Sequence, residues 1–414
     1  METFGQTLRR LRGTRSLRSL AGLTSFSKSY LHDLETGRRS PYRELVQALD
    51  EALGAGGQLL AAYRPDEHDN GPEVSPVLEE TLRLWDDLLR RRDFLLTTTA
   101  TTAATGLAAF PSLPGGGSER LAAHYELHEA IGRLGNLRGA PGSFELTLDH
   151  HDNVMTWYHA TPPGAERSRI AALASTTAGL VAFARFDIGQ YSTAHRGFRE
   201  AAGLAAEAGD ISAAANNIGQ ASRVMGVLGR HHDALNLADA AVRTAGSSAH
   251  PAVRSWLHAV RGYHHATVDH PDAAYADLDA AWSLLPQADD GAKPVYIGYL
   301  DASELSKWSA HTRNQLGEPR PALAAATDAQ AQWPGIMVRG SAELHVAAAR
   351  AHLATKDLDQ AITVLTHAAT IANSTGSVRN FRTVTDVRAR LSPYRDHRSV
   401  AEFDEYLLTG LGRP

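Results

Sequence analysis

Apolar residues recur every three or four positions along most of the chain, the spacing of one face of an α-helix. In the first 64 residues this spacing predicts five short helices, and Phe4, Leu8 and Leu11 share the apolar stripe of the first. No strand pattern occurs anywhere in the sequence. The chain is therefore predicted to be all-α.

Residues at the ends of the third and fourth predicted helices favour a particular motif. Ser27 can accept a free backbone N–H of the first turn of its helix. Gly37 follows the last periodic residue, as a C-terminal capping glycine does. Pro41 begins the next helix, where its missing N–H does no harm. Two short helices with a tight connection, the second polar at its start, are typical of a helix-turn-helix.

These residues belong to a run that resembles the Cro/repressor-type helix-turn-helix family, often called the XRE family, over about 60 residues. The residues that carry the resemblance are Leu20, Ala21, Ser27, Tyr30, Leu31, Leu34, Glu35, Gly37 and Pro41. The resemblance implies an ion pair between Arg10 of the first helix and Glu35. The family usually has Gln at the start of its second helix. This chain has Leu17 and Arg18 there, so Arg18 is the candidate for that phosphate contact.

Charge separates the same segment from the rest of the chain. Residues 1–64 hold ten Arg or Lys and six Asp or Glu, a net charge of +4. The whole chain has a formal charge of −5, so the remaining 350 residues carry −9. A small basic segment on a larger acidic body indicates that only the small segment approaches a polyanion.

The predicted DNA-reading residues follow from their positions on the recognition helix. Lys28 can donate to guanine, Asp33 can accept from cytosine, and Ser29 is permissive. Neighbouring arginines would contact phosphates, which position a protein without reading sequence. The predicted DNA-binding residues are Arg18, Ser27, Lys28, Ser29, Asp33, Arg38, Arg39 and Arg43. The alternative interpretation is a solvated helical surface.

The predicted domains are a helix-turn-helix domain at 1–64, a linker at 65–117 and a repeat domain at 118–414. The linker contains an amphipathic helix at about 76–96, with Leu78, Leu82, Trp85 and Leu89 on one stripe. Its arginine triplet and the following "DFLL" look like an export signal. Targeting signals act from the N-terminus, so an interdomain helix is favoured.

From about residue 165 the sequence repeats an alanine pattern on the second helix of each unit. The first alanines of the five units are Ala194, Ala234, Ala274, Ala322 and Ala361. Their spacings are 40, 40, 48 and 39 residues. The pattern resembles tetratricopeptide (TPR) repeats and predicts an α-solenoid of helical hairpins with one continuous core. The predicted role of this domain is sensing, dimerisation or both.

The resemblance implies that the first helix of each hairpin lines a concave face. Counting back from the alanines places the predicted ligand-binding residues there: Asn216, Gln220, Arg223, Trp256, Tyr263, Lys307 and Trp308. Amides can hold a peptide backbone, cations a carboxylate, and aromatic rings provide apolar contact. The alternative is that these are ordinary residues, either exposed or packed between helices.

Signals of catalysis or of a metal are weak. The chain has no cysteine, and the Asp-His-His run at 149–151 lies in a helical pattern without a preceding strand. No phosphate loop, dinucleotide motif or nucleophile elbow occurs. No N-terminal signal and no run of 18 apolar residues is present. We expect a cytoplasmic protein that is not an enzyme and has no cofactor, no metal and no membrane segment.

The order of parts resembles bacterial repeat-containing regulators, including a peptide-sensing group. The predicted function is sequence-specific DNA-binding transcriptional regulation. The predicted partners are double-stranded DNA, a peptide or small-molecule effector, and a second copy of the chain in a homodimer. The alternative function is a helical-repeat interaction scaffold with a weak DNA-binding head.

Overall fold

The computed structural model describes residues 3–17, 20, 28–37, 41, 43–63, 117–288 and 292–409. No strand occurs among these residues, so the prediction of an all-α fold is confirmed. The chain divides into two units, Met1–Glu79 and Glu80–Pro414. The predicted linker at 65–117, with its helix at 76–96, lies outside the described residues except for Gly117. The predicted domain boundaries therefore stay predictions.

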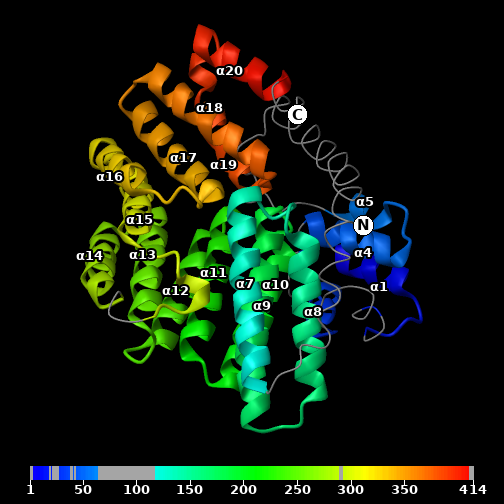
Figure 1. The fold of residues 1–414 in the computed structure, drawn as a ribbon. Helices are drawn as coiled ribbons and strands as arrows, with labels where there is room; N and C mark the ends of the chain where they lie inside the picture. The colour runs from blue at the N-terminus through cyan, green and yellow to red at the C-terminus, as the bar shows by residue number, and fades with distance from the viewer. Residues whose placement is uncertain are drawn as a thin grey trace. The chain divides into compact units, whose positions relative to one another are not determined.

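The N-terminal unit has four described helices around a small leucine-rich core. They are α1 (Phe4–Arg12), α3 (Lys28–Glu35), α4 (Arg43–Leu53) and α5 (Gln58–Ala62) (Figure 1). The buried core residues are Leu8, Leu20, Leu31, Leu34, Val46, Leu49 and Leu59. Most of the predicted second helix lies outside the described residues. The periodic leucines identified in the sequence are thus the ones that hold the described helices together.

The packing of α1 on the end of α3 corrects one prediction. A Cβ at Gly5 would lie 2.5 Å from the carbonyl oxygen of Leu34, so only glycine allows this approach. Arg12, seven residues further along α1 and on the same face, binds Glu35 through Nε at 2.5 Å and Nη2 at 3.0 Å. The ion pair predicted for Arg10 is therefore made by Arg12, because the face of α1 that contains Gly5 is the one against α3.

The C-terminal unit consists of long helices that follow one another in antiparallel pairs (Figure 1). They are α7 (Gly117–Arg138), α8 (Phe144–Ala160), α9 (Ala165–Asp187), α10 (Tyr191–Ala208), α11 (Ile211–Val227), α12 (His231–Ala245), α13 (Pro251–Thr267), α14 (Pro271–Ala288), α15 (Ala302–Gln315), α16 (Pro319–Gln332), α17 (Val338–Ala354), α18 (Leu358–Thr375), α19 (Val378–Arg390) and α20 (Arg398–Thr409). The predicted helical-repeat architecture is confirmed.

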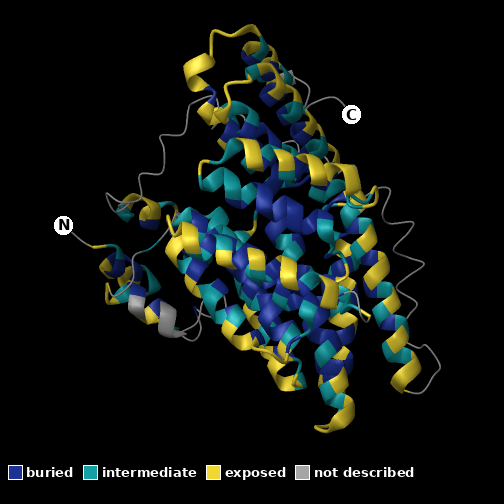
Figure 2. Ribbon diagram, turned by 90° about the vertical axis from the view of Figure 1, so that its left-hand side faces the viewer, coloured by how far each residue is buried: buried dark blue, intermediate teal, exposed yellow. Residues whose placement is uncertain are grey.

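The alanine pattern marks the surfaces where paired helices meet. All five marker alanines are buried, and each lies on the second helix of its hairpin: α10, α12, α14, α16 or α18. The small side chains let the helices approach closely. In the unit as a whole, buried positions lie toward the inside and exposed positions on the outer surface (Figure 2). In two hairpins a serine on the first helix donates a hydrogen bond to a backbone carbonyl of the second helix. Ser175 Oγ donates to Ala201 O, and Ser255 Oγ donates to Ala281 O, both at 2.8 Å.

The turn inside each hairpin requires one residue in the left-handed conformation. Gly189, Gly229 and Gly317 occupy this position, with φ of 83°, 74° and 74°. The same position, five residues before the marker alanine, holds Asp269 with φ of 60° and Lys356 with φ of 64°. The turn geometry is therefore common to all five hairpins, although only three of them have the glycine that usually accompanies it.

The first helices of the hairpins form the inside of the repeat unit. Consecutive inner helices contact one another from α9 through α11, α13, α15 and α17 to α19, and α19 in turn contacts α9. The N-terminal pair extends this arrangement: α8 packs on α9, whereas α7 contacts α9, α17 and α18. The inner helices thus enclose a space that α7 borders.

One described helix, α9, is long and apolar enough by length and composition to cross a membrane. In the structure 72% of the apolar window is buried within the unit. Its side chains pack against α8, α10 and α11. This burial is typical of a core helix in a helical-repeat protein.

Lys356 provides a test of the turn geometry. A non-glycine residue in the left-handed region is disfavoured, and Lys356 is exposed, so Lys356→Gly removes strain and little else. We expect the free energy of unfolding to rise by about 0.5–1 kcal/mol in urea denaturation. The matched control is Gly229→Ala, which has open space around its Cβ but φ of 74°, and should lower stability. A Lys356→Gly variant less stable than the parent would contradict this account.

Candidate functional site

A cavity of about 480 Å³ lies among the inner helices of the C-terminal unit. Its walls come from α7, α9, α11, α15, α17 and α19, with Phe198 of α10 and the segments 293–299 and 336–337. The volume is within the range of small-molecule sites in proteins. Both apolar and charged side chains line it, which is unusual for space that a helical-repeat core simply fails to fill.

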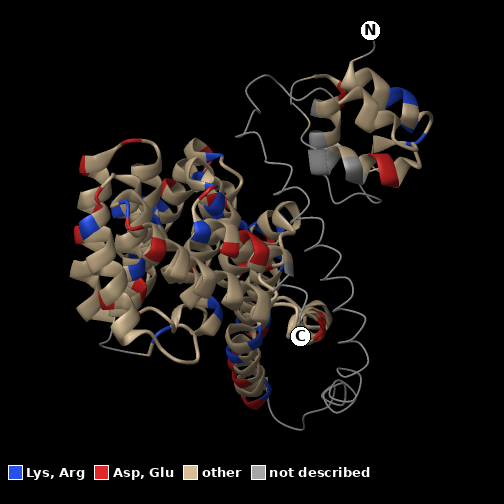
Figure 3. Cartoon of the chain, turned by 90° about the horizontal axis from the view of Figure 1, so that it is seen from above, with Lys and Arg blue, Asp and Glu red and all other residues tan. Residues whose placement is uncertain are grey.

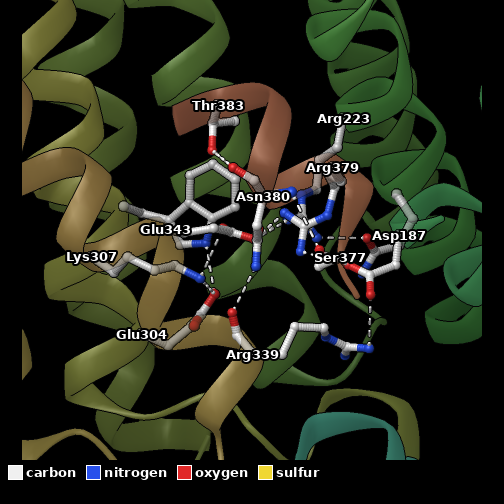
Figure 4. Close-up of polar contacts among 12 residues, drawn as sticks. Asp187, Arg223, Glu304, Lys307, Arg339, Glu343, Ser377, Arg379, Asn380 and Thr383 are labelled. Carbon is white, nitrogen blue, oxygen red and sulfur yellow. Dashed lines mark hydrogen bonds and ion pairs between the residues drawn. The ribbon is translucent and has the colours of Figure 1, made fainter. Parts of the chain in front are cut away.

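Seven charged side chains form a continuous network beside and within this cavity (Figure 4). None of their side chains is more than 12% exposed. They are Asp187, Arg223, Glu304, Lys307, Arg339, Glu343 and Arg379. Acidic and basic positions also lie near each other elsewhere in the C-terminal unit (Figure 3), but those pairs are mostly more exposed.

Glu343 on α17 lies at the centre of the network. Its carboxylate accepts from Arg379 Nη1 and, at 3.4 Å, from Arg223 Nη2. Lys307 Nζ lies 3.4 Å from its other oxygen. Burial by itself would raise the pKa of Glu343, but Arg379, Lys307 and Arg223 hold that pKa well below its usual range. Glu343 is therefore charged and joins α11, α15 and α19 to α17.

Asp187, the last residue of α9, is completely buried and closes the network at its other end. It accepts from Ser377 Oγ at 2.7 Å and from Arg379 Nη2 at 3.3 Å. Arg339 Nη1 lies 3.7 Å from its second oxygen. The three partners lie on α17, on α19 or just before α19. Asp187 thus connects the first inner helix of the repeats to the last two.

Several buried polar atoms at the cavity have no hydrogen-bond partner among the described residues. They are Asn216 Oδ1, His128 Nδ1 and Arg379 Nε. Each belongs to a residue that lines the cavity and is at most 5% exposed. Buried polar groups in proteins are nearly always satisfied, so such atoms at a cavity indicate a ligand or bound water.

Four of the predicted ligand-binding residues line the cavity: Asn216, Gln220, Arg223 and Lys307. Gln220 accepts from Arg223 Nη1 at 3.0 Å and donates to Tyr299 Oη at 3.5 Å. The structure brings these four to one cavity from α11 and α15, two inner helices that have α13 between them. Their role in binding stays a prediction.

The three predicted aromatic residues lie elsewhere. Trp256 is fully buried in the apolar core between α11, α13 and α15, where it contacts Gly219. Trp308 is 5% exposed and packs edge-on against Tyr263, with ring centroids 5.8 Å apart. No residue of α13 lines the cavity, because neighbouring hairpins and the segment 293–299 cover its inner face. Trp308 nevertheless contacts a residue that lines the cavity, because the guanidinium carbon of Arg223 lies 5.5 Å from the centroid of its ring.

Sequence reasoning missed Arg339, Arg379, Asp187 and the contribution of α7. Counting back from a marker alanine cannot find residues on α19 or α7, because neither helix is followed by one. From α7, Asn136 accepts from Arg339 Nη2 at 2.9 Å and donates to Met337 Sδ at 3.1 Å. These bonds hold the C-terminal end of α7 beside the charged network.

The backbone of Lys28, Ser29 and Asp33, the predicted base-contacting residues, lies in α3, and Arg43 begins α4. The side chains of these four residues lie outside the described part of the structure. Arg18, Ser27, Arg38 and Arg39 lie outside it altogether. What the structure does show is that α3 is fixed by the leucine core and by the Arg12–Glu35 pair.

Comparison with protein families identifies this unit. Residues 3–63 match the family model described as "Helix-turn-helix domain". The N-terminal unit is a helix-turn-helix domain. The resemblance inferred from Ser27, Gly37 and Pro41 is confirmed. The assignment of α3 as the recognition helix stays a prediction.

For the chain as a whole, no curated protein matches. Among solved structures, it is similar to a Rap protein crystallised in complex with competence and sporulation factor. The sequence identity is 13% and the TM-score 0.47, over 80% of this chain and 96% of that one.

Three histidines lie between α7 and α8 beside the cavity. The His124 and His150 rings stack with centroids 5.4 Å apart, and His128 lies 6.3 Å from His150. Burial lowers the pKa of His128 to about 4, and burial together with the neighbouring imidazoles lowers the pKa of His150 to about 3. Among the described residues, no group of three His, Cys, Asp or Glu could hold a metal ion. At neutral pH these rings are uncharged packing groups.

The histidines make stability depend on pH. Unfolding returns His150 to an ordinary pKa near 6.5, so below that pH the unfolded chain binds more protons than the folded one. The contribution of His150 to stability is therefore fully present above pH 6.5 and is lost as the pH falls from there toward 3. We expect His150→Phe to reduce the loss of unfolding free energy between pH 7 and pH 5 by about 2 kcal/mol in urea titrations. The exposed His232→Phe is the control; equal pH slopes for the parent and His150→Phe would refute the assignment.

Proposed function

We propose that the protein is a sequence-specific DNA-binding transcriptional regulator whose helical-repeat unit binds a peptide or other small effector. The observation that carries this proposal is that one chain has both a helix-turn-helix domain and a cavity lined by nearly buried charged and amide side chains. The proposed role of the protein is therefore regulation by binding.

The DNA-binding half of the proposal rests on α3. A recognition helix enters the major groove with the residues of its N-terminal turns against the base edges. Lys28 and Ser29 are the first residues of α3, and Asp33 lies one turn later. We assign base contacts to these three residues, and phosphate contacts to Arg18, Arg38, Arg39 and Arg43. The net charge of +4 in residues 1–64 supports approach to DNA.

The effector-binding half rests on the cavity. Small-ligand sites combine apolar walls with a few convergent polar groups. Phe183 and Leu180 provide apolar wall, whereas Asn216, Gln220 and Arg223 provide polar groups from α11. The unsatisfied oxygen of Asn216 offers an acceptor to an N–H of the effector.

A route from the effector to the DNA-binding domain begins at α7. In chain order α7 is the first described helix after that domain, and its His128, Arg133 and Asn136 line the cavity. An effector that engages Arg339 competes with the Arg339–Asn136 hydrogen bond that holds the end of α7. Occupancy of the cavity would thereby change how α7 is held. We propose that this change alters the placement of two helix-turn-helix domains in a homodimer on a two-fold DNA site.

The first test is a pull-down of fragmented genomic DNA with the purified full-length protein, followed by sequencing. We expect sharp enrichment in promoters that survives moderate salt, and its loss in the double variant Lys28→Ala/Asp33→Ala, because these side chains read bases. Enrichment that is diffuse and abolished by moderate salt would support the scaffold alternative instead. A monomer by light scattering at micromolar concentration would remove the homodimer from the proposal.

A further inference from the structure

The charges of the network do not balance. Among its members, Arg223, Lys307, Arg339 and Arg379 are cations, and Asp187, Glu304 and Glu343 are carboxylates. One positive charge is left over in a nearly buried position. An unpaired charge removed from water is strongly unfavourable. A bound anion would relieve this imbalance.

We propose that the cavity recognises a ligand with one carboxylate on an apolar body that also offers an N–H group. In chemical terms this is an N-acylated apolar amino acid or the C-terminal residue of an apolar peptide. The proposal names the chemical class of the effector and so rests on the proposed function.

Arg223 and Arg339 are the cations best placed for the carboxylate. Both line the cavity, and their ion pairs are long: 3.4 Å from Arg223 to Glu343 and 3.7 Å from Arg339 to Asp187. Arg379 and Lys307, by contrast, are held close to Glu343 and Glu304. Burial lowers the pKa of Arg339, which agrees with a cation short of negative charge. A guanidinium can bind both oxygens of a carboxylate at once.

The size of the charge excess favours a carboxylate over a phosphate. A carboxylate brings a single negative charge, which equals the excess within the network. A phosphate monoester brings about −1.5 to −2 near neutral pH and would leave buried negative charge. At the rim, Arg133 is already paired with Glu129 at 3.4 Å, and Lys293 donates to Leu300 O at 2.7 Å.

The rest of the wall fits the remainder of the ligand. Leu180, Phe183 and Ile336 offer apolar contact, and Ile336 is 43% exposed. Asn216 Oδ1 has no partner among the described residues, and its residue is 5% exposed. An amide N–H next to a carboxylate, as in an acylated amino acid, satisfies this acceptor. Arg223 and Asn216 lie seven residues apart, two turns along the same face of α11, so one ligand can reach both.

The test measures binding of matched acids and amides to the full-length protein by calorimetry and thermal unfolding. The probes are N-acetyl-L-leucine, N-acetyl-L-leucinamide, a Leu-Leu-Leu peptide with a free or amidated C-terminus, and inorganic phosphate. We expect each acid to bind at least tenfold more tightly than its amide and to raise the Tm. A tripeptide acid that binds at least tenfold more tightly than N-acetyl-L-leucine identifies a peptide as the source, and equal affinities identify a small acid.

Variants locate the site. Arg223→Gln should weaken binding of the acids at least tenfold and leave binding of the amides unchanged, whereas Arg223→Lys should keep part of the affinity. Arg320→Gln, exposed on the outer helix α16, is the control and should bind as the parent does. Circular dichroism and the ligand-free Tm establish that each variant is folded.

Three outcomes would overturn the proposal: equal affinity for acids and amides, no binding of any carboxylate probe, or tighter binding of phosphate. The genomic DNA pull-down, run on the same preparations, separates this proposal from the proposed function. Promoter enrichment without carboxylate binding would support the proposed DNA-binding regulator and contradict the proposed carboxylate effector. Carboxylate binding without promoter enrichment would support the carboxylate effector and contradict the DNA-binding regulator.

Discussion

The carboxylate of Asp187 is the constraint on which the C-terminal unit depends. It lies at the end of α9, has no exposed surface, and is bonded to Ser377 and Arg379 some 190 residues later in the chain. A buried carboxylate without partners would be strongly unfavourable, so α19 has to return to α9 for the charge to be tolerated. This return turns a row of hairpins into an enclosure. The cavity exists because the inner helices surround it rather than forming an open arc.

The same interaction relates stability to binding. Arg379 links Asp187 to Glu343, and Glu343 links α17 to α11 and α15 through Arg223 and Lys307. Hydrophobic residues of similar volume would often stabilise such an interior at least as well. A charged interior with long ion pairs and unsatisfied polar atoms therefore supports the proposed effector site. Strained or unsatisfied groups at binding sites are a common compromise between stability and function.

The position of α7 gives the cavity a physical connection to the rest of the chain. Helix α7 does not pair closely with its neighbour in sequence but contacts α9, α17 and α18. Near its end Gly139, with φ of 79°, passes so close to Thr375 O that a Cβ would lie 1.7 Å from it. Asn136 adds its bond to Arg339 one turn earlier. The end of α7 is thus fixed by the close approach at Gly139 and by the hydrogen bonds of Asn136 to Met337 and to Arg339, a cation of the network.

The sequence by itself determined the helical hairpins of this protein, whereas packing between distant helices determined the cavity. Alanine spacing predicted five helical pairs, and leucine spacing with the Gly37 and Pro41 signals predicted the helix-turn-helix domain, because helix periodicity and turn conformation depend on residues close in sequence. Counting along α11 and α15 also brought Asn216, Arg223 and Lys307 to one face. The burial of Trp256, the choice of Arg12 over Arg10 and the roles of Asp187, Arg339 and Arg379 depend on which helices meet across the unit. Those contacts join residues far apart in the chain, so only the tertiary structure could decide them.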